Sequence, residues 1–236
     1  MATARKAAAQ QATAGSGGRR QDRHSMTVTR YHFLSGLPKA GVDVLLRVLD
    51  QNPAFVTGEG TAAAALFEAT VGRMSDPSSV EAGLAVQQQK ALLRAVLDAV
   101  HHDRPIGSVV FDSNPAWIGQ IGILSALFPL SRFVVLLADA ADLDGPGQRE
   151  MRDLKAALDG PAAERILVIE RGRLINDALT VMDVLYHFLR EPEFDHDLSE
   201  FEAPGRTAGE GSGGVGGRGA TRLRADGDAT LLLKSG

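Results

Sequence analysis

Two glycines five residues apart, with a lysine between them, carry the strongest chemical signal in this sequence. Gly36 and Gly41 follow a β-branched and aromatic run, and a helical pattern begins directly after them. Glycines at a strand–helix turn let backbone N–H groups face an anion, and the start of the helix adds partial positive charge. Lys39, inside the loop, adds a full positive charge. The segment therefore predicts a loop that holds a phosphate or a similar anion.

The predicted anion-binding residues comprise the loop and the first positions of the helix. They are Gly36, Leu37, Pro38, Lys39, Ala40, Gly41, Val42 and Asp43. Nucleotide hydrolases place Lys and then Ser or Thr after the second glycine, where the hydroxyl holds Mg²⁺. Val42 and Asp43 occupy those places, so a P-loop kinase or nucleotide hydrolase is the weaker interpretation. Two alternatives stay open, an ordinary glycine turn and a lysine that is only solvated.

The elements that must position this loop are predicted by hydrophobic periodicity. Short, continuous apolar runs predict strands over residues 27–34, 107–111, 133–137 and 165–169. Apolar residues at helical spacing predict helices over residues 42–49, 61–71, 84–100, 115–128, 151–158 and 178–189. Because the strands are apolar throughout rather than alternating, they predict a parallel sheet that is buried on both faces.

The predicted fold class is therefore α/β, a P-loop-type three-layer sandwich with a central parallel sheet flanked by helices. This domain is expected to extend over residues 27–202. Residues 1–26 are rich in Gly, Ser and Gln and predict a disordered leader. Residues 203–236 are Gly-rich and poor in core residues, which predicts a flexible tail.

Composition disfavours several functional classes. The 236 residues carry a net charge of -4, whereas a general nucleic-acid binder is usually basic. The absence of cysteine excludes disulfides, cysteine zinc sites and thiol catalysis, and scattered histidines such as His187 and His196 predict no metal site. No apolar run reaches the ~18 residues of a membrane span, and the N-terminus lacks the apolar region of a secretory signal. A cytoplasmic location is expected.

Beyond the loop, several blocks of the chain resemble bacterial sulfotransferases in sequence order. Pro38, Lys39 and Gly41 match the loop that binds the 5′-phosphosulfate in that family. The positions of this loop that depart from the family are Ala40, Val42 and Asp43. The other matching blocks are residues 49–53, 109–114, 127–129, 165–170, 184–189 and 191–197, together with Trp117 and Leu174.

The resemblance implies transfer of a sulfuryl group from 3′-phosphoadenosine 5′-phosphosulfate (PAPS) to a hydroxyl or an amine of a small-molecule or peptide acceptor. It makes Lys39 the cation that stabilises the sulfuryl oxygens. It makes Glu59 the base, because the spacing from Pro38 to Glu59 resembles that of tyrosylprotein sulfotransferases. Asp112, at the carboxyl end of a central strand, is the second candidate base. In the alternatives, Glu59 is an exposed acid in a turn and Asp112 caps the helix that follows. A homodimer is compatible with the sequence.

The sequence departs most from the family at the site for the 3′-phosphate of the cofactor. The resemblance places an Arg at Ala138 and a Ser at Pro146, and three acids lie between them at Asp139, Asp142 and Asp144. Loss of a desolvated Arg–phosphate pair costs about 2 kcal/mol, and nearby acids repel a dianion. A second hypothesis therefore stays open, in which a degenerate sulfotransferase fold binds or scaffolds without catalysis.

Overall fold

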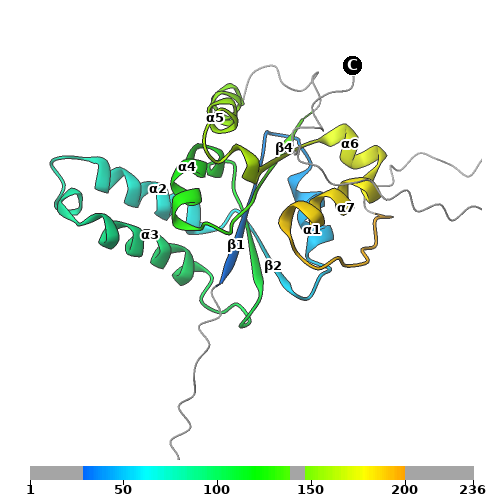
Figure 1. Ribbon diagram of the computed structural model, residues 1–236, viewed down its shortest axis with the longest axis horizontal. Coiled ribbons are helices and arrows are strands. Elements are labelled where there is room, and N and C mark those ends of the chain that lie inside the picture. Colours follow the sequence, from blue (N-terminus) through cyan, green and yellow to red (C-terminus); the bar gives the residue numbers. More distant parts are fainter. Residues whose placement is uncertain (1–28, 139–146, 200–236) are drawn as a thin grey trace, which may run out of the picture.

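The computed structural model of the protein describes residues 29–138 and 147–199 (Figure 1). A parallel sheet of five strands runs through its centre in the order β2-β3-β1-β4-β5. The strands are β1 (Arg30–Gly36), β2 (Phe55–Glu59), β3 (Val109–Ser113), β4 (Phe133–Leu137) and β5 (Ile166–Glu170). The α/β class and the parallel sheet are confirmed.

Helices cover both faces of this sheet, as Figure 1 shows. One face carries α1 (Val42–Leu49), α6 (Arg171–Asn176) and α7 (Ala178–Leu189). The other carries α2 (Ala62–Ser75), α3 (Val86–Val100), α4 (Trp117–Leu127) and α5 (Gln148–Leu158). Two short 3₁₀ helices are η1 (Val80–Gly83) and η3 (Ala163–Arg165). Among these helices none is long and apolar enough to cross a membrane.

The sequence pattern of α1 explains how the first helix packs. Leu45, Leu46, Val48 and Leu49 are buried, because their helical spacing places them on one stripe against the sheet. Asp43 and Arg47 lie four residues apart on the exposed side and form an ion pair of 3.2 Å. The helix therefore starts directly after the loop and is fixed in place by its apolar stripe.

Among the strands and α-helices, β2 and α6 were not predicted from the sequence. The β2 strand is short, lies at the edge of the sheet and includes Gly58, a residue that weakens strand signals. The α6 helix has six residues, too few to show a helical period. The first strand runs to Gly36 rather than ending at Leu34, because Ser35 and Gly36 pair with Val135 and Leu136 of β4. Residues 27 and 28 of the predicted strand lie outside the described residues.

The connections around β1 reverse the direction of winding between β1 and its two neighbours in the sheet. From β1 the chain crosses one face through α1 to β2, whereas from β3 it crosses the other face through α4 to β4. In open α/β sheets, ligands bind beyond the carboxyl ends of the strands where the direction of winding reverses. The loop after β1 lies at this position, which is where the sequence analysis expects an anion.

The segment after α7 returns to the end of α1 and is fixed there by polar contacts. The Gln51 side chain forms two hydrogen bonds with the Asp197 backbone. It donates to the Asp197 carbonyl at 3.0 Å and accepts from the Asp197 N–H at 2.7 Å. The Tyr186 hydroxyl accepts from Asn52 at 3.0 Å and lies 2.7 Å from Nε2 of His196. The contacts of Gln51 with Asp197 and of Asn52 with Tyr186 join residues more than 100 positions apart and hold the segment after α7 against the end of α1.

A buried histidine on β1 has a defined hydrogen-bonding state. Nδ1 of His32 accepts from the Arg132 N–H at 3.1 Å, so the ring proton lies on Nε2, which faces Glu191 at 3.4 Å. Glu191 also forms an ion pair of 2.7 Å with Arg30. Burial lowers the pKa of His32, against the opposing effect of Glu191. His32 is therefore neutral at pH 7 and acts as a structural link between β1 and the end of α7.

This histidine predicts that stability decreases on acidification. Because the folded-state pKa of His32 lies below its unfolded value of 6.5, the unfolded chain binds more protons as pH falls below that value. The free energy of unfolding should then fall from pH 7 to pH 5, by up to about 1.4 kcal/mol per pH unit for one histidine. Burial also lowers the pKa of His196, which contributes with the same sign.

The measurement is urea unfolding of the wild type and of His32→Gln at pH 7, 6 and 5. Glutamine keeps an acceptor for Arg132 and a donor for Glu191 but does not titrate. The variant should lose part of the pH slope, and His32→Gln/His196→Gln should lose more. Equal slopes in the wild type and both variants would contradict the assignment.

Candidate functional site

The loop after β1 is a tight turn built around Pro38 and Lys39. The Ala40 N–H donates to the Leu37 carbonyl at 3.1 Å, and Lys39 has a φ of 66°. Proline at the second position and positive φ at the third are the features of a type II turn. For a residue with a side chain, the left-handed conformation costs about 1 kcal/mol. Backbone strain of this kind concentrates at functional sites, so the turn is a candidate for one.

The two glycines that flank this turn have different roles. A Cβ atom on Gly36 would lie 2.3 Å from Cγ2 of Val42, so only glycine allows the strand and helix to approach this closely. Gly41 has a φ of 83° and forms the amino-terminal cap of α1. A Cβ on Gly147, before α5, would lie 2.8 Å from the Leu37 side chain, so the start of α5 also packs against the turn.

The backbone of the turn contributes fewer N–H groups to an anion than its sequence suggests. The Leu37 N–H donates to the Leu136 carbonyl of β4 at 3.0 Å, and the Ala40 N–H is used within the turn. Pro38 has no N–H group. The first N–H groups of a helix have no partner within that helix, so the N–H groups of the first turn of α1, from Val42 to Val44, are not used by helical hydrogen bonds; the first such bond is from the Leu45 N–H to the Gly41 carbonyl.

Asp43 does not occupy this amino terminus with its carboxylate. The side chain is 55% exposed and pairs with Arg47, and no side chain caps α1. The Asp43 carboxylate therefore does not cap the first N–H groups of α1. Lys39 and Pro38 are exposed, whereas the side chains of Leu37 and Ala40 are buried.

Glu59 lies at the same edge of the sheet, at the end of β2. It is exposed and stands in register with Ser113 of β3, which in turn stands in register with Leu34 of β1. Since β3 lies between them, the ends of β1 and β2 are separated by two strand spacings, about 10 Å. The structure thus brings the Lys39 turn and Glu59 to the same edge of the sheet.

The turn that carries Glu59 is fixed to the end of β3. The Gly60 N–H donates to the Ser113 carbonyl at 3.1 Å. The Thr61 hydroxyl caps α2 by accepting from Ala63 at 3.2 Å and donates to Oδ2 of Asp112 at 2.7 Å. The Glu59 backbone is therefore positioned on both sides, while its side chain remains in solvent.

Asp112, the second candidate base, is a fully buried structural carboxylate. Oδ1 accepts from Nε1 of Trp117 at 2.8 Å, and Oδ2 accepts from Thr61 and lies 2.7 Å from Nε2 of His101. Its two oxygens thus have three donors and no contact with solvent. Asp112 does not cap α4, because no side chain caps that helix; Oδ1 of Asn114 accepts from the Ala116 N–H at 3.0 Å just before the helix begins.

The two adjacent histidines after α3 make different contacts. His102 lies against the end of the helix, with Nδ1 3.2 Å from the Ala99 carbonyl. His101 turns inward to Asp112 instead and is buried. Nothing in the local pattern distinguishes the two histidines, since the partner belongs to another element.

The residues expected at the 3′-phosphate site are only partly described. Ala138 follows β4 and is buried, so no cation occupies the place where the resemblance expects Arg. Asp139, Asp142, Asp144 and Pro146 lie outside the described residues. Within the described ranges, no group of three His, Asp or Glu residues is arranged to hold a metal ion.

The fold and this edge define an α/β protein with a glycine-flanked strand–turn–helix at the switch point of its sheet. No family model and no curated protein matches the sequence. A sulfotransferase of Alicyclobacillus acidocaldarius is similar in structure, with 16% identity, coverage of 75% of this chain and 87% of that chain, and a TM-score of 0.48.

Two further solved structures are similar over much of the chain. Sulfotransferase STF9 of Mycobacterium avium is 13% identical, with coverage of 74% of this chain and 67% of that chain and a TM-score of 0.48. A sugar kinase of Janibacter sp. HTCC2649 is 17% identical, with coverage of 68% and 98% and a TM-score of 0.34. Because these identities and TM-scores are low, the function is argued from the residues of this chain.

Substitution of Asp112 tests the buried cluster. Asp112→Asn replaces an acceptor oxygen by an NH₂ group that faces one of three donors. The free energy of unfolding should fall by about 3 kcal/mol, because a buried donor is left unpaired and a charged hydrogen bond is lost. The exposed Asp103→Asn is the matched control and should change stability by less than about 0.5 kcal/mol. Urea unfolding measures both, and equal small effects would contradict the description of the cluster.

Proposed function

We propose that the protein transfers a sulfuryl group from PAPS to a hydroxyl or an amine of a small-molecule or peptide acceptor. One observation carries the proposal. The turn at Pro38 and Lys39 lies at the switch point of the sheet, at the start of an α1 helix that no side chain caps. Such a helix start binds phosphate-type anions through its N–H groups and its partial charge.

The proposed roles follow from the positions at this edge. The first turn of α1 and the Lys39 turn hold the phosphosulfate, with Lys39 stabilising negative charge on the sulfuryl oxygens. The acceptor lies between this turn and Glu59, which ends the strand on the far side of β3. Glu59 takes the acceptor proton as the acceptor oxygen or nitrogen bonds to sulfur. The bond from sulfur to the phosphate oxygen breaks, and 3′-phosphoadenosine 5′-phosphate leaves with the electron pair.

A second candidate function is a non-catalytic binding or scaffold role on the same fold. Two observations favour it. Ala138 supplies no cation for a 3′-phosphate, and the Leu37 and Ala40 N–H groups are already used by the fold. A P-loop kinase or nucleotide hydrolase has less support, because Val42 and Asp43 offer no hydroxyl for Mg²⁺. A cytoplasmic location and a homodimer remain part of the proposal.

Ligand binding separates these candidates. The melting temperature should rise by about 5 °C or more with 3′-phosphoadenosine 5′-phosphate at 100 times its Kd, because the ligand binds only the folded state. Lys39→Gln should weaken this binding about tenfold by removing a charge-assisted contact. Lys155→Gln, an exposed lysine on α5, is the matched control and should bind like the wild type.

Three outcomes of this experiment are decisive. No shift at millimolar ligand would assign the fold to the non-catalytic role. A shift with ATP that requires Mg²⁺ would assign it to the kinase class. An equal loss of affinity in Lys39→Gln and Lys155→Gln would remove Lys39 from the anion site.

Substitution of Glu59 tests the base. Glu59→Gln should reduce turnover about 100-fold or more, because the amide cannot accept the proton. The affinity for 3′-phosphoadenosine 5′-phosphate should not change, since Glu59 lies two strands from the Lys39 turn. Glu170→Gln is the control, because Glu170 is also an exposed carboxylate at the end of a strand, β5. Sulfated product is measured with a panel of phenols and amines, and unchanged turnover in Glu59→Gln excludes it as the base.

A further inference from the structure

An acidic groove lies along α7 and is lined by none of the residues of the proposed transfer site. It has a volume of about 370 Å³ and is formed by α7 and the segment that follows this helix. Its lining contains three acids, Asp183, Glu193 and Asp195, and no lysine or arginine. All three acids are exposed, and no ion pair between described residues uses them. Their charges are therefore available to a cationic occupant.

The groove also presents apolar side chains to solvent. Leu179 is 76% exposed and Phe194 is 36% exposed, and the Phe194 ring packs edge to face on His196 with centroids 4.9 Å apart. Burial lowers the pKa of His196, so its ring is neutral at pH 7 and does not offset the acids. An exposed ring beside carboxylates suits guanidinium groups, which pair with carboxylates and stack on aromatic faces. The groove therefore favours an arginine-rich segment.

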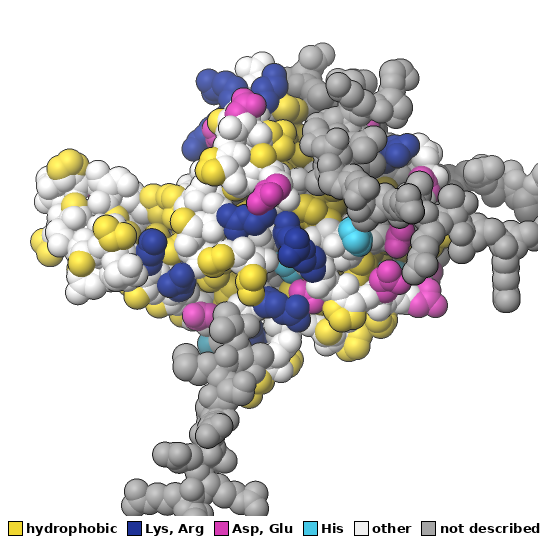
Figure 2. Space-filling view, in the orientation of Figure 1, with side chains coloured by type: hydrophobic (Ala, Val, Ile, Leu, Met, Phe, Trp, Pro, Cys, Tyr) yellow, Lys and Arg dark blue, Asp and Glu magenta, His cyan; other side chains and the backbone are white. Residues whose placement is uncertain are grey.

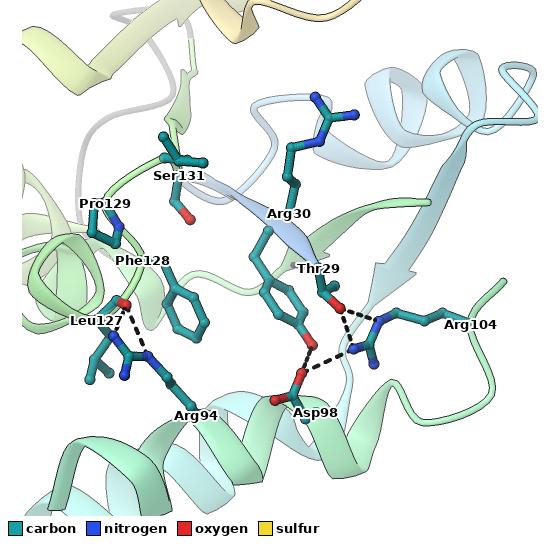
Figure 3. Close-up of a pocket in the computed structure, with 11 residues that line it drawn as sticks. Thr29, Arg30, Arg94, Asp98, Arg104, Leu127, Phe128, Pro129 and Ser131 are labelled. Atoms are coloured by element: carbon teal, nitrogen blue, oxygen red, sulfur yellow. Dashed lines mark hydrogen bonds and ion pairs between the residues drawn. The ribbon is translucent and has the colours of Figure 1, made fainter. Parts of the chain in front are cut away.

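The start of β1 is fixed beside the segment that forms this groove. Arg30 forms an ion pair of 2.7 Å with Glu191, which precedes Glu193 by two residues. Two residues span at most about 7 Å. Nε of Arg104 donates to the Thr29 hydroxyl at 3.1 Å, a contact visible in Figure 3, and fixes the other side of this end. The chain before Thr29 therefore leaves the domain close to the groove.

The segment before Thr29 has the composition that the groove favours. Its charged residues are mainly arginines, with one lysine and one acid: Arg5, Lys6, Arg19, Arg20, Asp22 and Arg23. The six residues from Arg23 to Thr29 can span up to about 20 Å. A helix of 12 residues, such as α7, is about 18 Å long. The arginines at positions 19, 20 and 23 can therefore reach the groove along its length.

The distribution of charge selects this occupant over others. Figure 2 shows Asp and Glu side chains together at the right of the visible face, where Figure 1 places the segment after α7, and Lys and Arg side chains in the middle of that face. A basic segment is repelled by the middle and attracted to the acidic side. Residues 200–236 also adjoin the groove in the chain, but they contain five basic and five acidic residues and begin with Glu200 and Glu202. They do not complement its charge.

We propose that residues 19–23 dock in this groove of the same chain, with their arginines directed to the three acids and to the Phe194 ring. Exposed ion pairs are individually weak. The short tether, however, provides an effective concentration in the millimolar range, so that a contact with a Kd of about 1 mM is about half occupied. The docking is sensitive to salt, because the Debye length falls from about 10 Å at 0.1 M to about 3 Å at 1 M. It does not depend on sulfuryl transfer.

Paramagnetic relaxation in the full chain tests the docking. Because the chain has no cysteine, Gln21→Cys places a nitroxide at a single position, and the reduced label gives the baseline. At about 0.1 M NaCl the relaxation enhancement of the groove amides, residues 179–186 and 193–198, should be at least about threefold that of residues 96–100 at the end of α3, which also lies beside Thr29. This excess should disappear at about 1 M NaCl. Equal enhancement at the two places, or an excess that salt does not change, would overturn the proposal.

Two matched double variants assign the docking to the acids of the groove. Asp183→Asn/Glu193→Gln removes two charges from it. Asp159→Asn/Glu68→Gln removes the same two types of charge from exposed sites after α5 and on α2. In the Gln21→Cys chain, the first pair should reduce the enhancement at the groove at least about threefold, whereas the second should leave it within about 1.5-fold. Equal reductions would show that only the net charge matters, and would overturn the proposal.

A mixed sample distinguishes docking within one chain from docking between two copies. The spin-labelled chain is mixed with isotope-labelled wild type, so that every enhancement observed is intermolecular. No enhancement is expected at the groove. An intermolecular enhancement equal to that within the single chain would assign the groove to the basic segment of a second copy, against the proposal. Backbone chemical shifts of β1 and β4 confirm that each variant is folded.

Discussion

The carboxylate of Asp112 connects three helices to the central sheet, and the arrangement of one whole face depends on it. Its partners are Thr61 at the start of α2, His101 after the end of α3 and Trp117 at the start of α4. A buried carboxylate is tolerated only when both oxygens are satisfied. The three donors must therefore be present together, which fixes where each of these helices begins or ends relative to β3.

The hydrogen bonds of Asp112 also affect the proposed site, through the backbone of the turn after β2. Thr61 belongs to the turn that follows Glu59, and the register of β2 with β3 places Glu59 beside Ser113. The buried Asp112 thus helps to position the backbone of the exposed Glu59. Both carboxylates are candidate bases by sequence, and their environments differ, because Asp112 is fully buried and Glu59 is exposed.

Local patterns in the sequence predict the elements but not the contacts between them. The apolar stripe of α1 and the continuous run of β4 give their bounds correctly, because each depends on residues within one segment. The partners of Asp112 lie 51, 11 and 5 residues away, and no local pattern identifies them. The edge strand β2 is not predicted for a related reason, because it forms by pairing with β3 and has no clear periodicity of its own.

At the turn around Pro38, the glycine motif predicts the course of the backbone but not the hydrogen bonds that the backbone makes. The glycine spacing correctly indicates a tight strand–turn–helix, and Gly36 and Gly41 are each required by the backbone. The motif does not show that the Leu37 N–H is used by β4 or that the Ala40 N–H closes the turn. The proposed anion site therefore consists of the first turn of α1 and the charge of Lys39, and not of a loop that wraps around the anion. Such a site depends more on Lys39 than a full phosphate loop does, because fewer N–H groups share the charge.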